Sequence, residues 1–257
     1  MEAQSAQQRL EKFRGALNQH EGIRHEANID HSAKLLEDAF ATGKRKFKTA
    51  AEMYEQEGTF RFWNSCQHSC LLLFHGLTMN EGRAYPHTYS WLSPAAIRIA
   101  KTLRQETDHV AYYCCHPMPN FAGNIPVLDV LSNLICQILE WNPALLREHE
   151  YQWLQKIKTE SFESTSTVFH ELLMLAAAVK PVYIVLDRAD QCSGRKYKLL
   201  HMLIDAVRTA RAAGCVVKML VVVDSAFWDV DLDECESLRK EAADCIKFVL
   251  GWDQTKG

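Results

Sequence analysis

The segment Val182-Tyr183-Ile184-Val185-Leu186-Asp187-Arg188-Ala189-Asp190-Gln191-Cys192 decides the fold class of this protein. It opens with an unbroken apolar run, which is typical of a strand that is buried on both faces of a sheet. Asp187 ends this run, and Asp190 follows it closely. Because strands of this kind occur in parallel sheets covered by helices, the segment predicts an α/β protein.

Other apolar runs of strand length lie on both sides of this segment. They cover residues 69–76, 110–115, 216–224 and, more weakly, 245–250. Helical patterns separate the runs, over residues 93–104, 126–139, 164–179 and 196–213, and Gly214 closes the last of them. Strands that alternate with helices predict a three-layer α/β fold with a parallel five-stranded sheet covered on both faces.

The first part of the chain has a different pattern. From residue 2 to residue 57, apolar residues such as Leu10, Phe13 and Leu17 recur at helical spacing among charged ones. We therefore divide the chain into an α-helical N-terminal segment, residues 1–59, and an α/β domain, residues 60–257.

The basic run at residues 43–48 is interpreted as a solvated face, with a nuclear address or a phosphate-contacting patch as alternatives.

Composition excludes several classes of protein. The chain has 257 residues, 47% hydrophobic and 24% charged, with a net charge of -3. These values exclude collagen-like, disordered and disulfide-stapled chains, and they give no basic excess for nucleic acid or an anionic membrane. The N-terminus has no apolar signal region, and no run approaches the length that spans a bilayer. We expect no membrane span and an intracellular protein, cytoplasmic or nuclear.

The nine cysteines are interpreted as reduced, buried thiols, because no signal peptide places the chain in an oxidising compartment. Two clusters deserve comparison with zinc sites: Cys66, His68 and Cys70, and Cys114, Cys115 and His116. Neither has the two paired ligand sets of a structural zinc site. No metal is expected at either cluster.

In an open parallel sheet, ligands bind where the strands end, so the residues that follow each strand are the candidates for chemistry. Asp187 occupies the position of a Walker B carboxylate, which helps to hold Mg²⁺, and Asp190 is placed to orient a water molecule. The alternative for Asp187 is a strand-end carboxylate that accepts hydrogen bonds from nearby N–H groups. For Arg188 we expect a surface ion pair, with a phosphate contact as the alternative.

With the elements in this order, residues 182–192 resemble the D-x-x-D-E-C form of Walker B in NACHT-like STAND P-loop NTPases, especially those of filamentous fungi. The resemblance extends over about residues 60–252 and includes the strand and helix at residues 110–117 and 126–139. It implies a sheet of the P-loop NTPase (ASCE/STAND) type whose first strand leads into a phosphate loop. It also implies Asp187 as the Mg²⁺ residue and Asp190 as the catalytic residue of an active enzyme.

The phosphate loop departs from the family pattern G-x-x-x-x-G-K-[ST]. After the first strand the chain reads Gly76-Leu77-Thr78-Met79-Asn80-Glu81-Gly82-Arg83-Ala84, which is one residue too long. The cofactor-binding positions are therefore Gly76, Gly82, Arg83 and Ala84. Arg83 replaces the lysine that reaches the phosphates, and Ala84 has no hydroxyl for Mg²⁺. The loop is a degenerate Walker A motif, and we expect no tightly bound cofactor.

An aromatic insertion follows this loop before Ser93 and Pro94 begin the next helix. It contains Tyr85, Tyr89 and Trp91, which are candidates for binding a partner because aromatic residues anchor interfaces. The alternative is that these rings cover the edge of the sheet.

These features predict a non-hydrolysing pseudo-NTPase that acts as a protein-interaction, regulatory or scaffold module with a protein partner. The alternative is a nucleotide-binding STAND ATPase switch with an atypical phosphate loop, which would use ATP and Mg²⁺ and in which Asp190 would be catalytic. Nucleic-acid binding through residues 44–48 and 196–198 is a weaker third hypothesis. Sequence signatures of α/β-hydrolases, dinucleotide-binding folds and zinc proteases are absent.

Overall fold

The computed structural model describes residues 2–17, 33–34, 58–77, 92–115, 125–158, 161–194, 196–224, 237, 240 and 243–253. Every statement about structure below concerns these residues.

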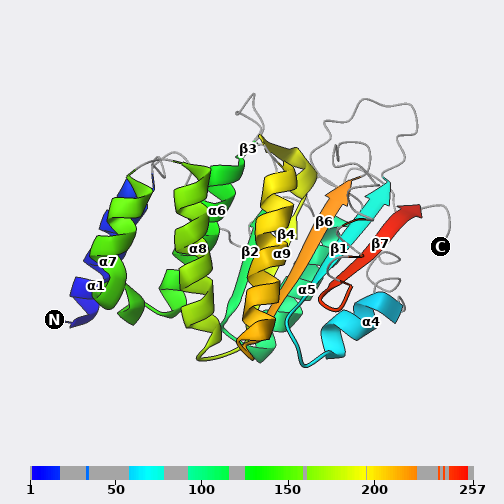
Figure 1. The fold of residues 1–257 in the computed structure, drawn as a ribbon, viewed down its shortest axis with the longest axis horizontal. Coiled ribbons are helices and arrows are strands. Elements are labelled where there is room, and N and C mark those ends of the chain that lie inside the picture. The colour runs from blue at the N-terminus through cyan, green and yellow to red at the C-terminus, as the bar shows by residue number, and fades with distance from the viewer. Residues whose placement is uncertain are drawn as a thin grey trace.

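A parallel five-stranded sheet forms the centre of the protein (Figure 1). Its strands are β1 (Cys70–Leu77), β2 (Val110–Cys114), β4 (Val182–Asp187), β6 (Val217–Asp224) and β7 (Ile246–Asp253). Their order across the sheet is β2-β4-β6-β1-β7, and every neighbouring pair runs parallel. The five predicted strands are confirmed, and β7 runs a few residues further than its apolar pattern.

Helices cover the sheet. They are α1 (Glu2–Ala16), α4 (Gly58–Ser65), α5 (Ser93–Glu106), α6 (Val127–Trp141), α7 (Ala144–Ile157), α8 (Phe162–Ala177) and α9 (Lys196–Ala212). A short parallel pair, β3 (Ile125–Pro126) with β5 (Cys192–Ser193), and a 3₁₀ turn, η2 (Ala189–Gln191), complete the described elements. The sequence pattern did not predict α4, α7, β3 or β5.

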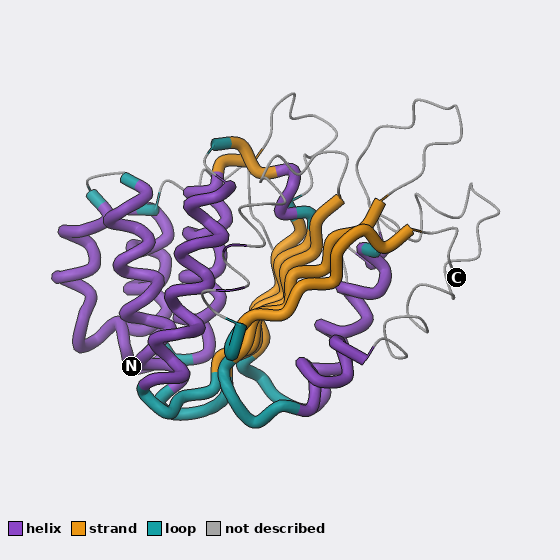
Figure 2. Tube along the Cα trace, turned by 45° about the vertical axis from the view of Figure 1, so that its right-hand side comes forward, coloured by secondary structure: helices purple, strands orange, loops and turns teal. Residues whose placement is uncertain are grey.

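The direction of each crossover decides which face a helix covers. The connection from β1 to β2 runs one way across the sheet, whereas β2 to β4 and β4 to β6 run the other way. Because parallel crossovers are right-handed, α5 lies on one face and α6, α8 and α9 lie on the other. Figure 2 shows the strands between these two groups of helices. The predicted three layers are confirmed.

Alternate residues of β1 divide the core into two clusters. Leu71 and Leu73 belong to the cluster of α1 and α6 to α9, while Leu72 and Phe74 belong to the cluster of α4 and α5. The period of two along a strand explains this division. Since both clusters are buried, the positions from Cys70 to Phe74 are all apolar.

Helix α1 packs on the outside of the first cluster. Leu10, Phe13 and Leu17 are buried there, and the Phe13 ring meets Trp153 of α7 edge to face at 6.4 Å between centroids. The charges of α1 are also paired, since Lys12 contacts Glu150 of α7 at 2.8 Å. The N-terminal helix is thus part of the same core as α7.

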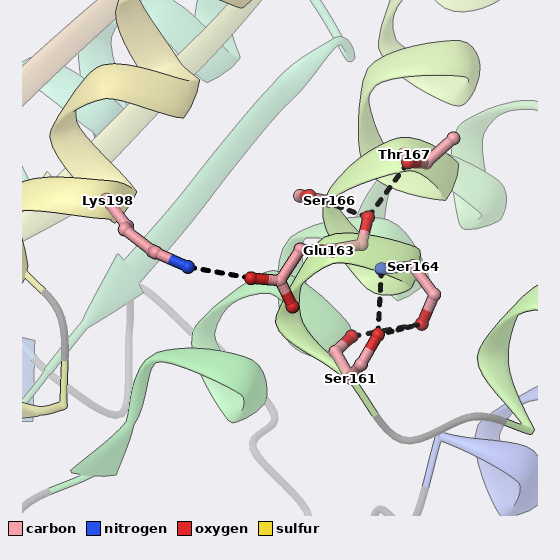
Figure 3. Close-up of polar contacts among 6 residues, drawn as sticks. All are labelled: Ser161, Glu163, Ser164, Ser166, Thr167 and Lys198. Atoms are coloured by element: carbon pink, nitrogen blue, oxygen red, sulfur yellow. Dashed lines mark hydrogen bonds and ion pairs between the residues drawn. The ribbon is translucent and has the colours of Figure 1, made fainter.

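Two helix ends show why the chain turns where it does. Ser161 is the N-cap of α8 and accepts a hydrogen bond from the Ser164 N–H at 3.1 Å (Figure 3). Gly214 follows α9 with φ +71°, a conformation that costs glycine little, as its predicted closing role requires.

The outer edge of β2 is completed by a side chain. Gln137 of α6 donates to the Tyr112 carbonyl at 2.9 Å and accepts from the Tyr112 N–H at 3.1 Å. An edge strand otherwise leaves such groups unpaired.

None of the helices in the described part of the chain has the length and apolar character needed to cross a bilayer.

Candidate functional site

The carboxyl edge of the sheet is the place where a ligand site is expected. The helices that follow β1 and β4 cover opposite faces, so the chain leaves this edge in two directions. Open α/β sheets bind ligands in the crevice at such a switch point. Gly76 of β1, Asp224 of β6 and Asp187 of β4 all lie at this edge, and Gly76 pairs directly with Asp224.

Asp187 is the last residue of β4 and is fully buried. Its carboxylate Oδ2 accepts a hydrogen bond from the Cys114 thiol of β2 at 3.5 Å. Burial raises the pKa of Asp187 from 3.8 to about 6, and the Ser93 hydroxyl, the Arg188 cation and Cys114 limit that rise. Its other oxygen, Oδ1, has no hydrogen-bond partner. The donor to this carboxylate among the described residues is thus a thiol, and the alternative in which Asp187 accepts from backbone N–H groups stays a prediction.

Ser93 is the residue that the sequence did not assign to the site. It is fully buried at the start of α5, close enough for its hydroxyl to lower the pKa of Asp187, yet its Oγ makes no hydrogen bond of normal geometry. We expected Ser93 to cap α5, but the N-cap is Leu92 and no side chain caps this helix. Ser93 instead brings its hydroxyl to the carboxylate that ends β4. The signal in the sequence was a serine followed by a proline at the start of the helix that comes after the first strand.

Asp190 lies in η2, immediately beyond β4, and is held by a buried ion pair. The Arg188 Nε and Nη2 groups donate to its two oxygens at 2.8 to 3.2 Å. The side chains of Arg188 and Asp190 are 1% and 0% exposed, so the expected surface ion pair is wrong in its location. Gln191 Nε2 also donates to Asp190, at 2.8 Å.

The backbone of Arg188 makes this ion pair possible. Arg188 has φ 58° and ψ 39°, a left-handed conformation that is uncommon for a residue other than glycine. This turn sends the chain back on itself at the end of β4. An arginine and an aspartate two positions apart can then face one another inside the protein.

The remaining predicted site residues fall on a part of the chain outside the description. Gly82, Arg83, Ala84, Tyr85, Tyr89 and Trp91 lie outside the described residues. The degenerate phosphate loop and the aromatic partner loop therefore stay predictions. Gly76 is described, and it lies at the end of β1, where the phosphate loop was predicted to begin.

Thiols surround this edge of the sheet. Cys115 and Cys192 are buried, and burial raises the pKa of Cys115, with the neighbouring Cys192 thiol contributing. Burial also raises the pKa of Cys114, and the charge of Asp187 adds to that effect. Within the described ranges, no group of histidine, cysteine and acidic side chains is arranged to hold a metal ion.

A separate groove of about 540 Å³ lies between α8 and α9. One ion pair crosses it, because the Lys198 ammonium of α9 contacts Glu163 of α8 at 2.7 Å (Figure 3). The Ser166 and Thr167 hydroxyls donate to the Glu163 carbonyl, also drawn in Figure 3. The groove lies on the outer surface of these helices. None of the residues predicted for the nucleotide site lines it, but Tyr197 and Lys198, from the segment named in the nucleic-acid hypothesis, do.

Comparison with known proteins identifies the region that holds the site. The family described as Nephrocystin 3, N-terminal, matches residues 92–223, slightly more than half of the chain. The match runs from the start of α5 to β6 and includes Ser93, Asp187 and Asp190. A search of curated proteins gave no match. The family is related to the NACHT/STAND group that residues 182–192 resemble. On the extent of this match, the chain belongs to the nephrocystin 3 N-terminal family.

Proposed function

We propose that this protein is a non-hydrolysing pseudo-NTPase that acts as a protein-interaction, regulatory or scaffold module in an intracellular complex. The proposal includes a finer fold assignment, a P-loop NTPase core of the filamentous-fungal STAND type with a degenerate Walker A loop. The family match and the parallel sheet support the coarser part of this assignment, an NTPase-like α/β core, while the fungal type and the degenerate loop rest on the sequence resemblance alone.

The buried ion pair of Asp190 carries the proposal. Hydrolysis needs a group that is free to orient or deprotonate the attacking water. Asp190 is the candidate from the sequence, and its carboxylate is occupied by Arg188 and Gln191. Separating a buried carboxylate from the cation that pairs with it costs several kcal/mol, about 3 to 5 when one partner is removed. Asp190 thus serves the local structure and is not free to activate water.

One observation favours the alternative, a nucleotide-binding switch. Ser93 Oγ and Asp187 Oδ1 are both buried without a hydrogen-bond partner at the start of α5. A hydroxyl and a carboxylate are the oxygen ligands that Mg²⁺ prefers, and a helix N-terminus favours phosphate. In this alternative Ser93 and Asp187 would hold Mg²⁺, which would neutralise the phosphate charge of a bound nucleotide.

A ligand titration separates the two functions. Thermal shift and calorimetry are measured with ATP and ADP, with and without Mg²⁺, on the wild type and on Asp187→Ala and Ser93→Ala. Ligand at 100 times its Kd would stabilise the fold by about 2.7 kcal/mol, so binding would be visible. We expect no shift. A Mg²⁺-dependent shift that both variants abolish would contradict the pseudo-NTPase and support the switch.

The interaction half of the proposal is tested at the aromatic insertion. Tyr85, Tyr89 and Trp91 are changed to alanine together, and partners are identified by cross-linking in cells. Tyr151, 76% exposed on α7, supplies a matched control as Tyr151→Ala. We expect the triple variant to lose a cross-linked protein that the control keeps. Equal cross-linking in both variants would show that the insertion does not bind the partner.

A further inference from the structure

Two thiols meet at the opposite end of the sheet from the candidate site. Cys66 follows α4, Cys70 begins β1, and their sulfur atoms lie 2.9 Å apart. Figure 1 shows α4 beside the start of the sheet, away from the arrowheads that mark the carboxyl edge. A disulfide bond is about 2.05 Å long, so about 1 Å of approach would join the two sulfurs.

Hydrogen bonds hold the short turn between these cysteines in place. Ser69 Oγ donates to the Cys215 carbonyl at 2.7 Å and accepts from the Val217 N–H at 2.9 Å. On the other side, the Cys66 N–H donates to the Phe62 carbonyl at 2.9 Å. The turn is thus tied both to β6 and to α4, which keeps the two thiols facing one another.

A buried lysine adds to this support. Lys218 Nζ donates to the Asn64 carbonyl at 2.8 Å and lies over the rings of Trp63 and Tyr183. The lysine side chain is only 4% exposed, so its positive charge acts at short range on the thiols beside it. It lowers the pKa of Cys70 against the stronger, opposite effect of burial.

The two cysteines differ in their access to solvent. Cys66 is half-buried, whereas Cys70 is 2% exposed. A small oxidant in solution therefore reaches Cys66 first, and Cys70 is placed to react with the product. This pairing of an accessible thiol with a neighbouring resolving thiol is the arrangement found in proteins that are oxidised reversibly.

We propose that Cys66 and Cys70 form a redox-active dithiol that hydrogen peroxide converts to an intramolecular disulfide. The Cys66 thiol releases its proton, its sulfur attacks one peroxide oxygen, and the O–O bond breaks. The hydroxide that leaves takes up the released proton, so Cys66 sulfenic acid and water form. The Cys70 sulfur then attacks the Cys66 sulfur and displaces hydroxide, which takes the Cys70 proton and leaves as water. The two thiols lose two electrons, and one peroxide becomes two waters.

Mass spectrometry tests this proposal directly, because trypsin releases a peptide, residues 62–83, that contains these two cysteines and no other. The full chain is treated with peroxide, denatured, labelled with N-ethylmaleimide and digested. After peroxide, we expect the peptide to carry no N-ethylmaleimide label and to be two hydrogens lighter than the unlabelled reduced peptide. Treatment with dithiothreitol before labelling should restore both labels. Cys215, a half-buried thiol alone in the peptide 212–218, is the internal control. Its peptide holds no second cysteine, so peroxide cannot convert it to a disulfide within the peptide, and it should keep its label under conditions in which residues 62–83 lose both.

Two variants test the order of the steps. Cys70→Ser removes the resolving thiol, so Cys66 should stop at a sulfenic acid that dimedone traps. Cys66→Ser should leave Cys70 fully labelled after peroxide. If both cysteines of the wild-type peptide keep their labels at every peroxide concentration tested, or if Cys66 bridges to another cysteine, the proposal is wrong.

Discussion

The Ser93 hydroxyl, at the start of α5, lies beside the Asp187 carboxylate, at the end of β4, and both are fully buried. Neither Ser93 Oγ nor Asp187 Oδ1 has a hydrogen-bond partner. A buried carboxylate with an unpaired oxygen destabilises the fold whenever it is charged. This relationship gives the first prediction its sign.

Asp187→Asn should stabilise the protein at neutral pH and much less in acid. The pKa of Asp187 in the folded protein is about 6, above its ordinary 3.8. The wild-type fold therefore loses stability as the pH rises through that interval and the buried carboxyl group becomes charged. Between pH 4.5 and pH 7.5 the variant should gain about 2 kcal/mol relative to the wild type. Urea unfolding at the two pH values measures this difference. Asp205→Asn, at an exposed position on α9, is the matched control for the substitution itself.

The ion pair of Arg188 with Asp190 should behave as a coupled unit. Arg188→Ala leaves a buried charge unpaired and should cost about 3 to 5 kcal/mol. The double variant with Asp190→Ala should cost less than the sum of the two single variants, by about 1 to 3 kcal/mol. A double-mutant cycle by urea denaturation measures the coupling. Additive effects would show that the pair contributes no coupling to the fold.

Helix α1 should depend on one aromatic contact. Phe13 is fully buried against Trp153, so Phe13→Ala should cost about 3 to 5 kcal/mol. Tryptophan fluorescence followed through urea unfolding reports the loss. Phe62→Ala, at a side chain that is 49% exposed, is the matched control and should change stability by less than about 1 kcal/mol. Equal effects at the two positions would contradict the packing of α1.

Two glycines offer a test of backbone conformation alone. An added Cβ would meet nothing within 4 Å at Gly15 or at Gly214, so contacts do not separate them. Gly15 is inside helix α1, and Gly15→Ala should stabilise by about 0.5 to 1 kcal/mol. Gly214 has φ +71°, and Gly214→Ala should destabilise by about 1 kcal/mol. Thermal unfolding compares the two, and shifts in the same direction would overturn this explanation.

Local pattern predicted most of the secondary structure but missed α7. Leu146, Trp153 and Ile157 are its buried residues, widely spaced among charged and polar ones, because α7 lies on the outside of the helical layer and buries a narrow stripe. The strands were clearer, since residues such as Leu71 and Leu72 are buried on opposite faces and leave no polar position.

The chemistry was harder to predict than the fold. Asp187 and Asp190 were singled out from their place after a strand, and they lie at the end of β4 and in η2, but their surroundings were not predicted. Arg188 was expected at the surface because a charged side chain usually is. Its left-handed backbone turns it inward to Asp190, and this conformation has no signature in the residue type.

The amino-acid sequence alone was sufficient for the α/β class, the five strands and the positions of the strand-end acids, because burial on both faces imposes a continuous apolar run. Tertiary structure alone decided the strand order and two arrangements at the site, the placement of Ser93 beside Asp187 and the ion pair of Arg188 with Asp190. The physical reason is that the direction of a crossover and the conformation of a turn depend on how whole elements pack. No local sequence pattern records that packing.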